Sequence, residues 1–339
     1  MNNWAHGTLE KLNSCPVCDA STSNAVHYSR RDDNLNFPDT WHMHKCKSCR
    51  SIYLNPRPDD KSLPLAYQNY YTHDLPIDKT LVGEGFIYRL IGDYLLFRFN
   101  FKAKKPLFGG RYLFKIIPPL RMQLDVYGRH IPKSMCHKNT RLLDFGCGSG
   151  DFLLRAQSMG INATGLEPDP VAVAAMKAIG LNVIQGDLQT LQSQGKYEYI
   201  TLSHVIEHVK SPKELLTGIH EALTAGGYIW LALPNPESFG ARFFKKAWVG
   251  LHPPFHLIIP SQTTLSKWLK DAGFESITFI KRGGVNKSSW RLNNAISQRE
   301  KVGTSKLLSK ILKFFVDICS TSSTRYGEET IVIARKPRS

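Results

Sequence analysis

Long apolar runs are missing from this sequence. None reaches the roughly 18 consecutive uncharged apolar residues that a helix needs to cross a bilayer, which excludes a spanning segment of that kind. Residues 1–14 are polar and lack the apolar core of a secretory signal. We therefore expect a cytoplasmic protein, with a peripheral position at a membrane surface as the alternative.

Acidic residues are scarce relative to basic ones. The chain has 28 Asp and Glu against 44 Lys and Arg, for a net charge of +16. The excess is concentrated in residues 86–141, which contain twelve Lys or Arg and two Asp among many aromatic and aliphatic residues. We expect a helical cap with a solvated basic face there. A membrane-surface contact is the first alternative, and nucleic-acid binding is the less favoured second.

Cysteine is also sparse, but four of the seven cysteines form two Cys-x-x-Cys pairs. The pairs are Cys15 with Cys18 and Cys46 with Cys49. Two such pairs can place four thiolates tetrahedrally around one zinc ion, so we expect a structural zinc ribbon. A redox dithiol needs only one pair, and the polar N-terminus argues against disulfides. The intervening histidines could replace a cysteine as ligands; they are His27, His42 and His44.

A short apolar strand, a turn with alternating glycines and a helix start follow one another at residues 142–151. The strand ends at Asp144, and the turn contains Gly146, Gly148 and Gly150. Glycines permit a tight strand-to-helix turn and let a ligand approach the backbone closely. The spacing Gly-x-Gly-x-Gly differs from the Gly-x-Gly-x-x-Gly of dinucleotide sites. The pattern predicts a nucleoside-type cofactor over this turn.

Carboxylates end the next two expected strands. Glu167 closes residues 163–167 and can accept hydrogen bonds from both hydroxyls of a ribose. Asp187 closes residues 181–187 and is placed to accept from an adenine amino group. Two further strands are expected at residues 197–202 and 226–234, with helices between them. This alternation predicts a doubly wound, mainly parallel α/β sheet with its ligand at the carboxyl ends of the strands.

With these motifs the sequence resembles the class I S-adenosylmethionine-dependent methyltransferases. The resemblance implies a Rossmann-like, seven-stranded sheet whose last, antiparallel strand lies at residues 328–337. It implies a cofactor site for S-adenosylmethionine, made of Asp144, Gly146, Cys147, Gly148, Gly150, Glu167, Asp187, Leu188 and Ser203. Within the site we expect Cys147 to be a small buried residue and not a nucleophile.

Residues 46–58 and 67–71 resemble the N-terminal zinc-binding region of a subgroup found in polysaccharide and natural-product sugar pathways. That resemblance implies a sugar or lipid-linked glycan acceptor. Known sugar C-methyltransferases of this build have a further C-terminal domain, which we expect this chain to be too short to contain. We expect a zinc ribbon at residues 1–60, a basic helical linker or cap at 61–138 and the methyltransferase domain at 139–339.

Histidines follow the fourth and fifth strands on the side where the cofactor is expected. A sugar hydroxyl needs a base of near-neutral pKa, and histidine is the natural supplier. The candidates are His208 after the fourth strand and His252 and His256 after the fifth, with His256 preferred. Residues 204–208 also fit the His-x-x-Glu-His pattern of an inverted zinc peptidase. That motif requires a long helix, so we reject it here.

Two segments near the C-terminus complete the expectations. Residues 305–318 have apolar side chains at helical spacing with lysines on the other face, which predicts an amphipathic helix. We expect this helix to pack on the core, with a position on lipid as the alternative. The polar stretch 283–303 is expected to be a loop.

The sequence favours an enzyme that methylates a small molecule, most simply a sugar or lipid-linked glycan at oxygen. An RNA methyltransferase that uses the ribbon and the basic surface is the second hypothesis. The sequence lacks the Asn-Pro-Pro-Tyr/Phe signature after the fourth strand that is typical of base amino-group methylation, which argues against this second hypothesis. A catalytically silent cofactor-binding scaffold is the third. The oligomeric state is left open.

Overall fold

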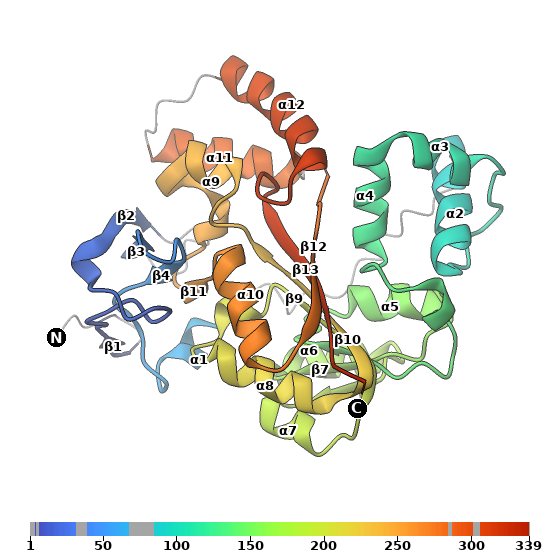
Figure 1. The fold of residues 1–339 in the computed structure, drawn as a ribbon, viewed down its shortest axis with the longest axis horizontal. Helices are drawn as coiled ribbons and strands as arrows, with labels where there is room; N and C mark the ends of the chain where they lie inside the picture. The colour runs from blue at the N-terminus through green and yellow to red at the C-terminus, as the bar shows by residue number, and fades with distance from the viewer. Residues whose placement is uncertain are drawn as a thin grey trace.

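The computed structural model describes residue 4 and residues 7–31, 39–67, 85–283, 287–300 and 306–338. A sheet of seven strands lies at its centre, in the order β12-β13-β10-β9-β6-β7-β8 (Figure 1). The strands are β6 (Leu142–Phe145), β7 (Thr164–Glu167), β8 (Val183–Gln185), β9 (Tyr197–Ser203), β10 (Leu223–Pro234), β12 (Glu275–Ile280) and β13 (Glu329–Arg335). The strands from β10 to β8 are parallel, whereas β13 is antiparallel to both of its neighbours. The expected mainly parallel seven-stranded fold is confirmed.

Both faces of the sheet are buried, which explains why its strands are almost continuously apolar. In β10, Leu231 belongs to one hydrophobic core and Trp230 to the other, as the alternation of side chains along a strand requires. Helices cover the two faces. They include α5 (Asp151–Ser158), α6 (Pro170–Ala178), α7 (Leu188–Gln192), α8 (Pro212–Ala222) and α10 (Gln262–Asp271).

The cysteine-rich part forms a separate small sheet that includes a strand from the C-terminal half of the chain. Its order is β11-β4-β3-β2, and its strands are β2 (Ala25–Arg31), β3 (Thr40–Cys46), β4 (Ile52–Leu54) and β11 (Ile258–Ile259). A further antiparallel pair joins β1 (Leu9–Glu10) to β5 (Arg57–Pro58), and the short helix α1 (Leu63–Ala66) follows. Because β11 pairs with β4, the ribbon is joined to the loop that follows β10. The proposed domain boundaries at residues 60 and 138 stay predictions.

The basic segment forms three helices: α2 (Phe86–Phe99), α3 (Gly110–Ile116) and α4 (Pro118–Tyr127). They lie beyond α5 at one side of the sheet (Figure 1). No helix in the described ranges is both long enough and apolar enough to cross a bilayer. Residues 68–71, part of the subgroup motif, lie outside the described residues.

Of two expectations near the C-terminus, the first is wrong and the second is confirmed with a difference in how much of the helix is exposed. The stretch expected to be a loop contains helix α11 (Lys287–Arg299), whose Trp290 is buried and donates a hydrogen bond to Ser309 Oγ at 2.9 Å. The amphipathic helix exists as α12 (Lys306–Ser322), and it packs on the hydrophobic core through Val316 and Leu312, as expected. Val316 and two serines are buried, while most of its large apolar residues are exposed.

Further helical elements lie between β10 and β11. They are α9 (Phe239–Phe244) and the 3-10 turns Lys245–Ala247 and Val249–Leu251. Together they form the loop that contains His252 and His256, above the carboxyl end of β10 (Figure 1).

Candidate functional site

The glycine turn between β6 and α5 has the backbone conformation that the sequence predicts. Gly146, Gly148 and Gly150 have φ values of 67°, 53° and 85°, in the left-handed region that favours glycine. A Cβ at Gly146 would lie 2.6 Å from Cγ2 of Val205, in the loop after β9. The glycine turn therefore packs directly against the loop after β9, which contains His204 and His208.

Asp144 is buried beneath this turn and is only partly satisfied. It forms an ion pair with Arg129 and accepts a hydrogen bond from Thr201 Oγ1 at 2.9 Å. Burial raises the pKa of Asp144, and Arg129 opposes that shift. Its Oδ2 atom is buried without a hydrogen-bond partner among the described residues. A buried acceptor of this kind fits a donor such as the amino group of the cofactor's methionine part.

Glu167 is held by backbone amides at the end of β7. Its two oxygens accept from Gly148 N at 2.8 Å and from Asp169 N at 3.3 Å. Burial raises its pKa, and these hydrogen bonds oppose the shift. Since an ionised carboxylate can accept about four hydrogen bonds, acceptor capacity remains for a ribose diol. Glu167 therefore fits its expected role.

Asp187 has a structural role in addition to the expected one. Its side chain accepts from the backbone N–H groups of Gln189 at 2.9 Å and Thr190 at 3.3 Å and so caps helix α7. The residue is exposed, so its second oxygen can still accept from an adenine amino group.

The three other expected cofactor residues differ in exposure. Cys147 is buried, as expected, with its Sγ atom 3.8 Å from Sδ of Met176. Leu188 begins α7 and packs against Gly218 of α8. Ser203 ends β9 and is half-buried. It directly precedes His204, the first residue of the loop that packs against the glycine turn.

The structure brings the two histidine-containing loops together. The backbone N–H of Leu257 donates to the carbonyl of Glu207 at 2.7 Å. The ring of His256 lies with its centroid 4.8 Å from that of His208 and 5.1 Å from that of His252. The expectation that both loops flank one site is therefore supported by their contact, whereas the catalytic roles stay predictions.

The three histidines differ in their suitability as a base. His256 is buried and its Nδ1 donates to the carbonyl of Gly250 at 2.8 Å, which leaves Nε2 facing Glu207 Oε1 at 3.9 Å. Burial lowers its pKa well below the ordinary value, and burial lowers that of His252 to about 3. His208 is half-exposed, and its Nδ1 lies 3.1 Å from the carbonyl of Phe255 and 2.9 Å from the Tyr67 hydroxyl.

The contact with Phe255 fixes the tautomer of His208. A carbonyl can only accept, so Nδ1 carries the proton and Nε2 is left as an acceptor. Burial lowers the pKa of His208, which keeps the ring neutral near pH 7. This arrangement is that of a general base.

A charged chain that the sequence analysis missed lies beneath these histidines. His204 has a φ of 56°, and its ring nitrogens contact Glu207 Oε1 at 3.0 Å and Glu329 Oε1 at 3.1 Å. Burial opposes its charge, but the two carboxylates outweigh burial and raise the pKa of His204. Arg282 forms an ion pair with Glu329. Glu329 and Arg282 are more than seventy residues from His204, so no sequence motif could have indicated this chain.

Glu207 contributes a second partly satisfied carboxylate. It is completely buried, and its Oε2 atom has no hydrogen-bond partner among the described residues. One ligand atom each from Glu207, His208 and His256 lie within 4.8 Å of one another. This group can take a donor from a substrate or hold a divalent cation.

The four cysteines meet as the spacing predicts. Sγ of Cys15 lies 3.7 Å from that of Cys49, and Sγ of Cys18 lies 3.7 Å from that of Cys46. All four sulfur atoms are within 4.8 Å of one another. With a Zn–S bond of about 2.3 Å, sulfurs at the corners of a tetrahedron are about 3.8 Å apart, so the cluster fits zinc.

The nearby histidines do not belong to the cysteine cluster. His44 Nε2 lies 3.1 Å from the carbonyl of Asn55, and His42 Nδ1 lies 3.0 Å from Ser29 Oγ. His27 packs edge-on against His44, with ring centroids 4.2 Å apart. Four thiolates are therefore the complete ligand set in the described part of the chain.

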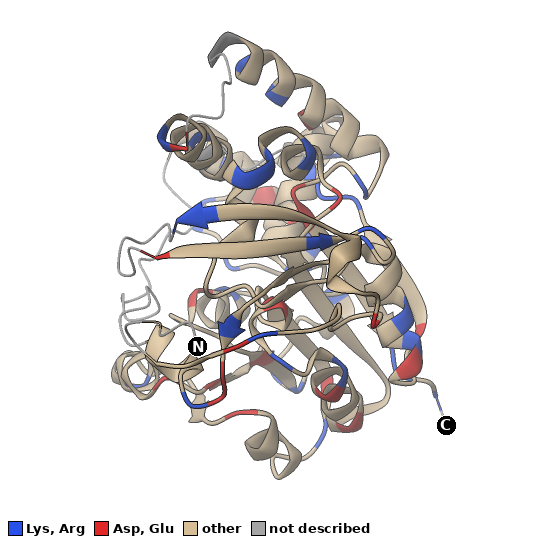
Figure 2. Cartoon of the chain, turned by 90° about the vertical axis from the view of Figure 1, so that its left-hand side faces the viewer, with Lys and Arg blue, Asp and Glu red and all other residues tan. Residues whose placement is uncertain are grey.

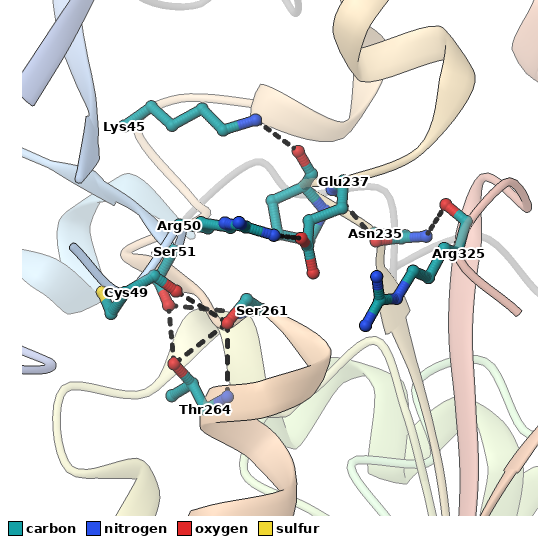
Figure 3. Close-up of polar contacts among 10 residues, drawn as sticks. Lys45, Cys49, Arg50, Ser51, Asn235, Glu237, Ser261, Thr264 and Arg325 are labelled. Carbon is teal, nitrogen blue, oxygen red and sulfur yellow. Dashed lines mark hydrogen bonds and ion pairs between the residues drawn. The ribbon is translucent and has the colours of Figure 1, made fainter. Parts of the chain in front are cut away.

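Polar contacts attach the cysteine cluster to the loops around the histidines (Figure 3). Ser261 Oγ donates to the carbonyl of Cys49 at 2.7 Å, and Arg50 forms an ion pair with Glu237 at 3.3 Å. Lys45 Nζ donates to the carbonyl of Pro236 at 2.8 Å. Glu237 and Ser261 stand at either end of the loop that contains His252 and His256, so the ribbon helps to position that loop.

Comparisons with curated proteins found similar methyltransferases. The ubiquinone biosynthesis O-methyltransferase of Pseudomonas aeruginosa (strain UCBPP-PA14) is 26% identical over 151 residues, which cover 40% of this chain and 64% of that protein. The protein with the same name from Cronobacter sakazakii (strain ATCC BAA-894) is 29% identical over 151 residues, 40% of this chain and 61% of its own. The chain therefore spans less than two thirds of the length of these relatives.

Solved structures and family models were compared with the chain as well. A SAM-dependent methyltransferase from Archaeoglobus fulgidus shares 19% identity, with 72% of this chain and 99% of that chain covered and a TM-score of 0.44. Residues 99–278, more than half of the chain, match the model of a family described as a methyltransferase domain. The chain therefore belongs to this methyltransferase domain family.

Proposed function

We propose that this enzyme transfers a methyl group to a hydroxyl of a small molecule, with a sugar or a lipid-linked glycan intermediate as the acceptor. One observation carries the proposal: a half-exposed, neutral histidine, His208, lies in the loop that follows β9 with its Nδ1 held by the Phe255 carbonyl, and this loop packs against the cofactor turn. A hydroxyl, unlike an amine, has to lose its proton as it attacks, so a base of this kind favours oxygen as the acceptor atom. The names of the ubiquinone biosynthesis O-methyltransferases support the same atom.

S-adenosylmethionine, when bound, supplies a methyl group on a positively charged sulfur. In the proposal, Asp144 and Glu167 hold its amino-acid and ribose parts, and Asp187 holds the adenine. His208 takes the acceptor's proton at Nε2, while Phe255 fixes its ring through Nδ1. His256, whose Nδ1 donates to the Gly250 carbonyl, holds the loop between β10 and β11 in place beside Glu207 and is a positioning residue.

The cysteine cluster is proposed to hold a structural zinc ion. The sulfur separations fit tetrahedral coordination, and four thiolates leave no open position for a substrate. Zinc would fix the ribbon against the loop that contains His252 and His256.

Two measurements test the proposed reaction. Calorimetric titration with S-adenosylmethionine and S-adenosylhomocysteine should show binding in the micromolar range, and binding of neither would sink the enzyme hypothesis. Acceptor screening with nucleotide sugars and lipid-linked glycans, followed by product mass spectrometry, then identifies the substrate. His208→Ala should lower kcat by about a hundredfold or more without changing cofactor affinity. His137→Ala, at a histidine far from the cluster, is the matched control.

A further inference from the structure

Large apolar side chains are exposed on one group of helices to an unusual degree. Of the twenty large hydrophobic residues exposed in the described part of the chain, fourteen belong to α2, α3 with its preceding turn, α4 and α12. These fourteen, here called the interfacial face, are Phe86, Ile87, Tyr88, Phe97, Phe108, Tyr112, Leu113, Ile116, Leu120, Leu308, Ile311, Phe314, Phe315 and Ile318. Ile116 is 77% exposed, Phe108 72% and Phe314 65%. Scattered apolar residues are normal on a surface, but a concentration of this kind marks an interaction site.

Helix α12 is the clearest example of an apolar stripe that faces outward. A surface helix normally buries its apolar stripe and exposes its polar face. In α12 the buried positions include Ser309 and Ser320, whereas Ile311, Phe315 and Ile318 form an exposed apolar stripe. The apolar stripe of α12 therefore faces away from the rest of the molecule, where a partner can contact it.

Basic side chains surround the apolar ones. Lys115 Nζ lies 5.2 Å from the ring centroid of Phe97, and Lys133 Nζ lies 5.4 Å from the same ring. The two acidic residues of the basic segment each neutralise one arginine, since Asp93 is bound by Arg111 at 2.6 Å and Asp125 lies 3.4 Å from Arg98. Ten of the twelve positive charges are therefore left without a counter-charge from the segment. Aromatic rings beside lysines are the composition expected where a protein lies in the headgroup region of a bilayer.

The two parts of the interfacial face are neighbours. Helix α4 contacts α12, and both helical groups extend from the same end of the molecule (Figure 1). α12, at the top of both views, has lysines in its first half (Figure 2). The chain runs directly from this face into the site: Arg129, just after α4, binds Asp144, and Glu329, just after α12, binds His204.

We propose that the interfacial face binds the surface of an anionic bilayer, with α2, α3 and α12 lying in the plane of the headgroups. Anionic lipid complements the excess of lysine and arginine. A second copy of the chain fits less well, because a symmetric dimer would place two basic faces against each other. The proposal deepens the proposed function, on which it rests for one point: the acceptor is presented by the membrane as a lipid-linked molecule.

The experiment is flotation of the full chain with vesicles of equal parts phosphatidylcholine and phosphatidylglycerol, compared with pure phosphatidylcholine. We expect the protein to float with the anionic vesicles and to be released by high salt. The variant Ile116→Ser/Phe314→Ser/Phe315→Ser should lower partitioning at least about tenfold for each side chain that inserts, since burying one contributes about 1.5–3 kcal/mol. Lys115→Gln should lower it about fivefold, as expected from about 1 kcal/mol for each charge.

Val171→Ser/Ile179→Ser is the matched control, because both residues are exposed and apolar but lie on α6, outside the interfacial face. The control should float as the unmodified chain does. Absence of flotation with anionic vesicles would overturn the proposal, as would flotation of the triple variant at the control's level. A dimer in light scattering that the triple variant dissociates, without vesicle binding, would show instead that the face joins two copies.

Cofactor calorimetry on the same proteins separates this proposal from the proposed function. The triple variant should bind S-adenosylmethionine as the unmodified chain does, since none of its changes touches the cofactor site. Loss of flotation with cofactor binding intact supports the bilayer contact. Flotation by a chain that binds no cofactor would sink the enzyme hypothesis and leave the bilayer contact standing.

Discussion

At the residue scale, Asp187 combines an expected ligand role with a structural one. Because its carboxylate caps α7, Asp187→Ala should lower the free energy of unfolding by about 1 kcal/mol as well as weaken S-adenosylmethionine binding. Asp187→Ser separates the two effects, since a serine hydroxyl caps a helix as well as aspartate does. We expect the serine variant to keep its stability in chemical denaturation and to lose affinity in calorimetry. Full affinity in both variants would remove the adenine assignment.

The protonation of His208 leads to a prediction about pH. Burial lowers the pKa of this ring below the ordinary 6.5, and the neutral form is the one that can act as a base. Activity should therefore be constant from pH 8 down to about 6.5 and fall only as the pH drops through the lowered pKa. The check is the pH dependence of kcat at saturating cofactor. An acid limb centred above pH 7 would exclude His208 as the base.

His256, the preferred base in the sequence analysis, is better suited to positioning. Its Nδ1 is bound to Gly250 and its ring is buried, so a substrate hydroxyl has little access to it. We expect His256→Gln to retain more activity than His208→Ala, because the amide can still bond to the Gly250 carbonyl. The measurement is kcat for both variants alongside S-adenosylmethionine affinity. A larger loss of kcat in His256→Gln would restore His256 as the base.

At the element scale, β11 links the zinc centre to catalysis. This strand pairs with β4 of the ribbon and follows directly after His256. Cys46→Ser should therefore release zinc and lower activity as well, because the ribbon no longer fixes the histidine loop. Zinc content by mass spectrometry and turnover are the two measurements. Cys319→Ser, at a cysteine outside the cluster, should change neither. A Cys46→Ser protein without zinc but with full activity would contradict the link.

The helices near the C-terminus show where element prediction fails. The polar composition of residues 283–303 favours a loop. Trp290 and Ile296 are nevertheless buried, and their packing on neighbouring parts of the structure stabilises helix α11. The apolar period of α12 correctly indicates a helix, but the same period cannot tell whether the apolar stripe faces the core or the outside. Periodicity reports that a helix has two faces and leaves open what each face contacts.

At the scale of the whole molecule, the ribbon and the catalytic sheet share one hydrophobic core. Trp41 and Tyr53 of the ribbon belong to the same buried cluster as Phe255, Leu257 and Leu231. We therefore expect one cooperative thermal transition, which shifts to lower temperature as a whole when a chelator removes zinc. Differential scanning calorimetry with and without chelator is the test. Two separate transitions, with only one sensitive to the chelator, would show that the ribbon folds independently.

The sequence by itself determined the methyltransferase fold, the glycine turn with its carboxylates and the pairing of the four cysteines. Each of these depends on residues close together in the chain: a turn needs glycine at fixed positions, a strand ends where its apolar run ends, and a Cys-x-x-Cys pair needs only its own loop. Only the tertiary structure decided that His208 is the accessible histidine and that His204 joins Glu207 to Glu329. It also decided that β11 completes the ribbon and that α12 turns its apolar stripe outward. These features depend on contacts between distant segments, and the burial that sets protonation and exposure exists only after the chain has packed.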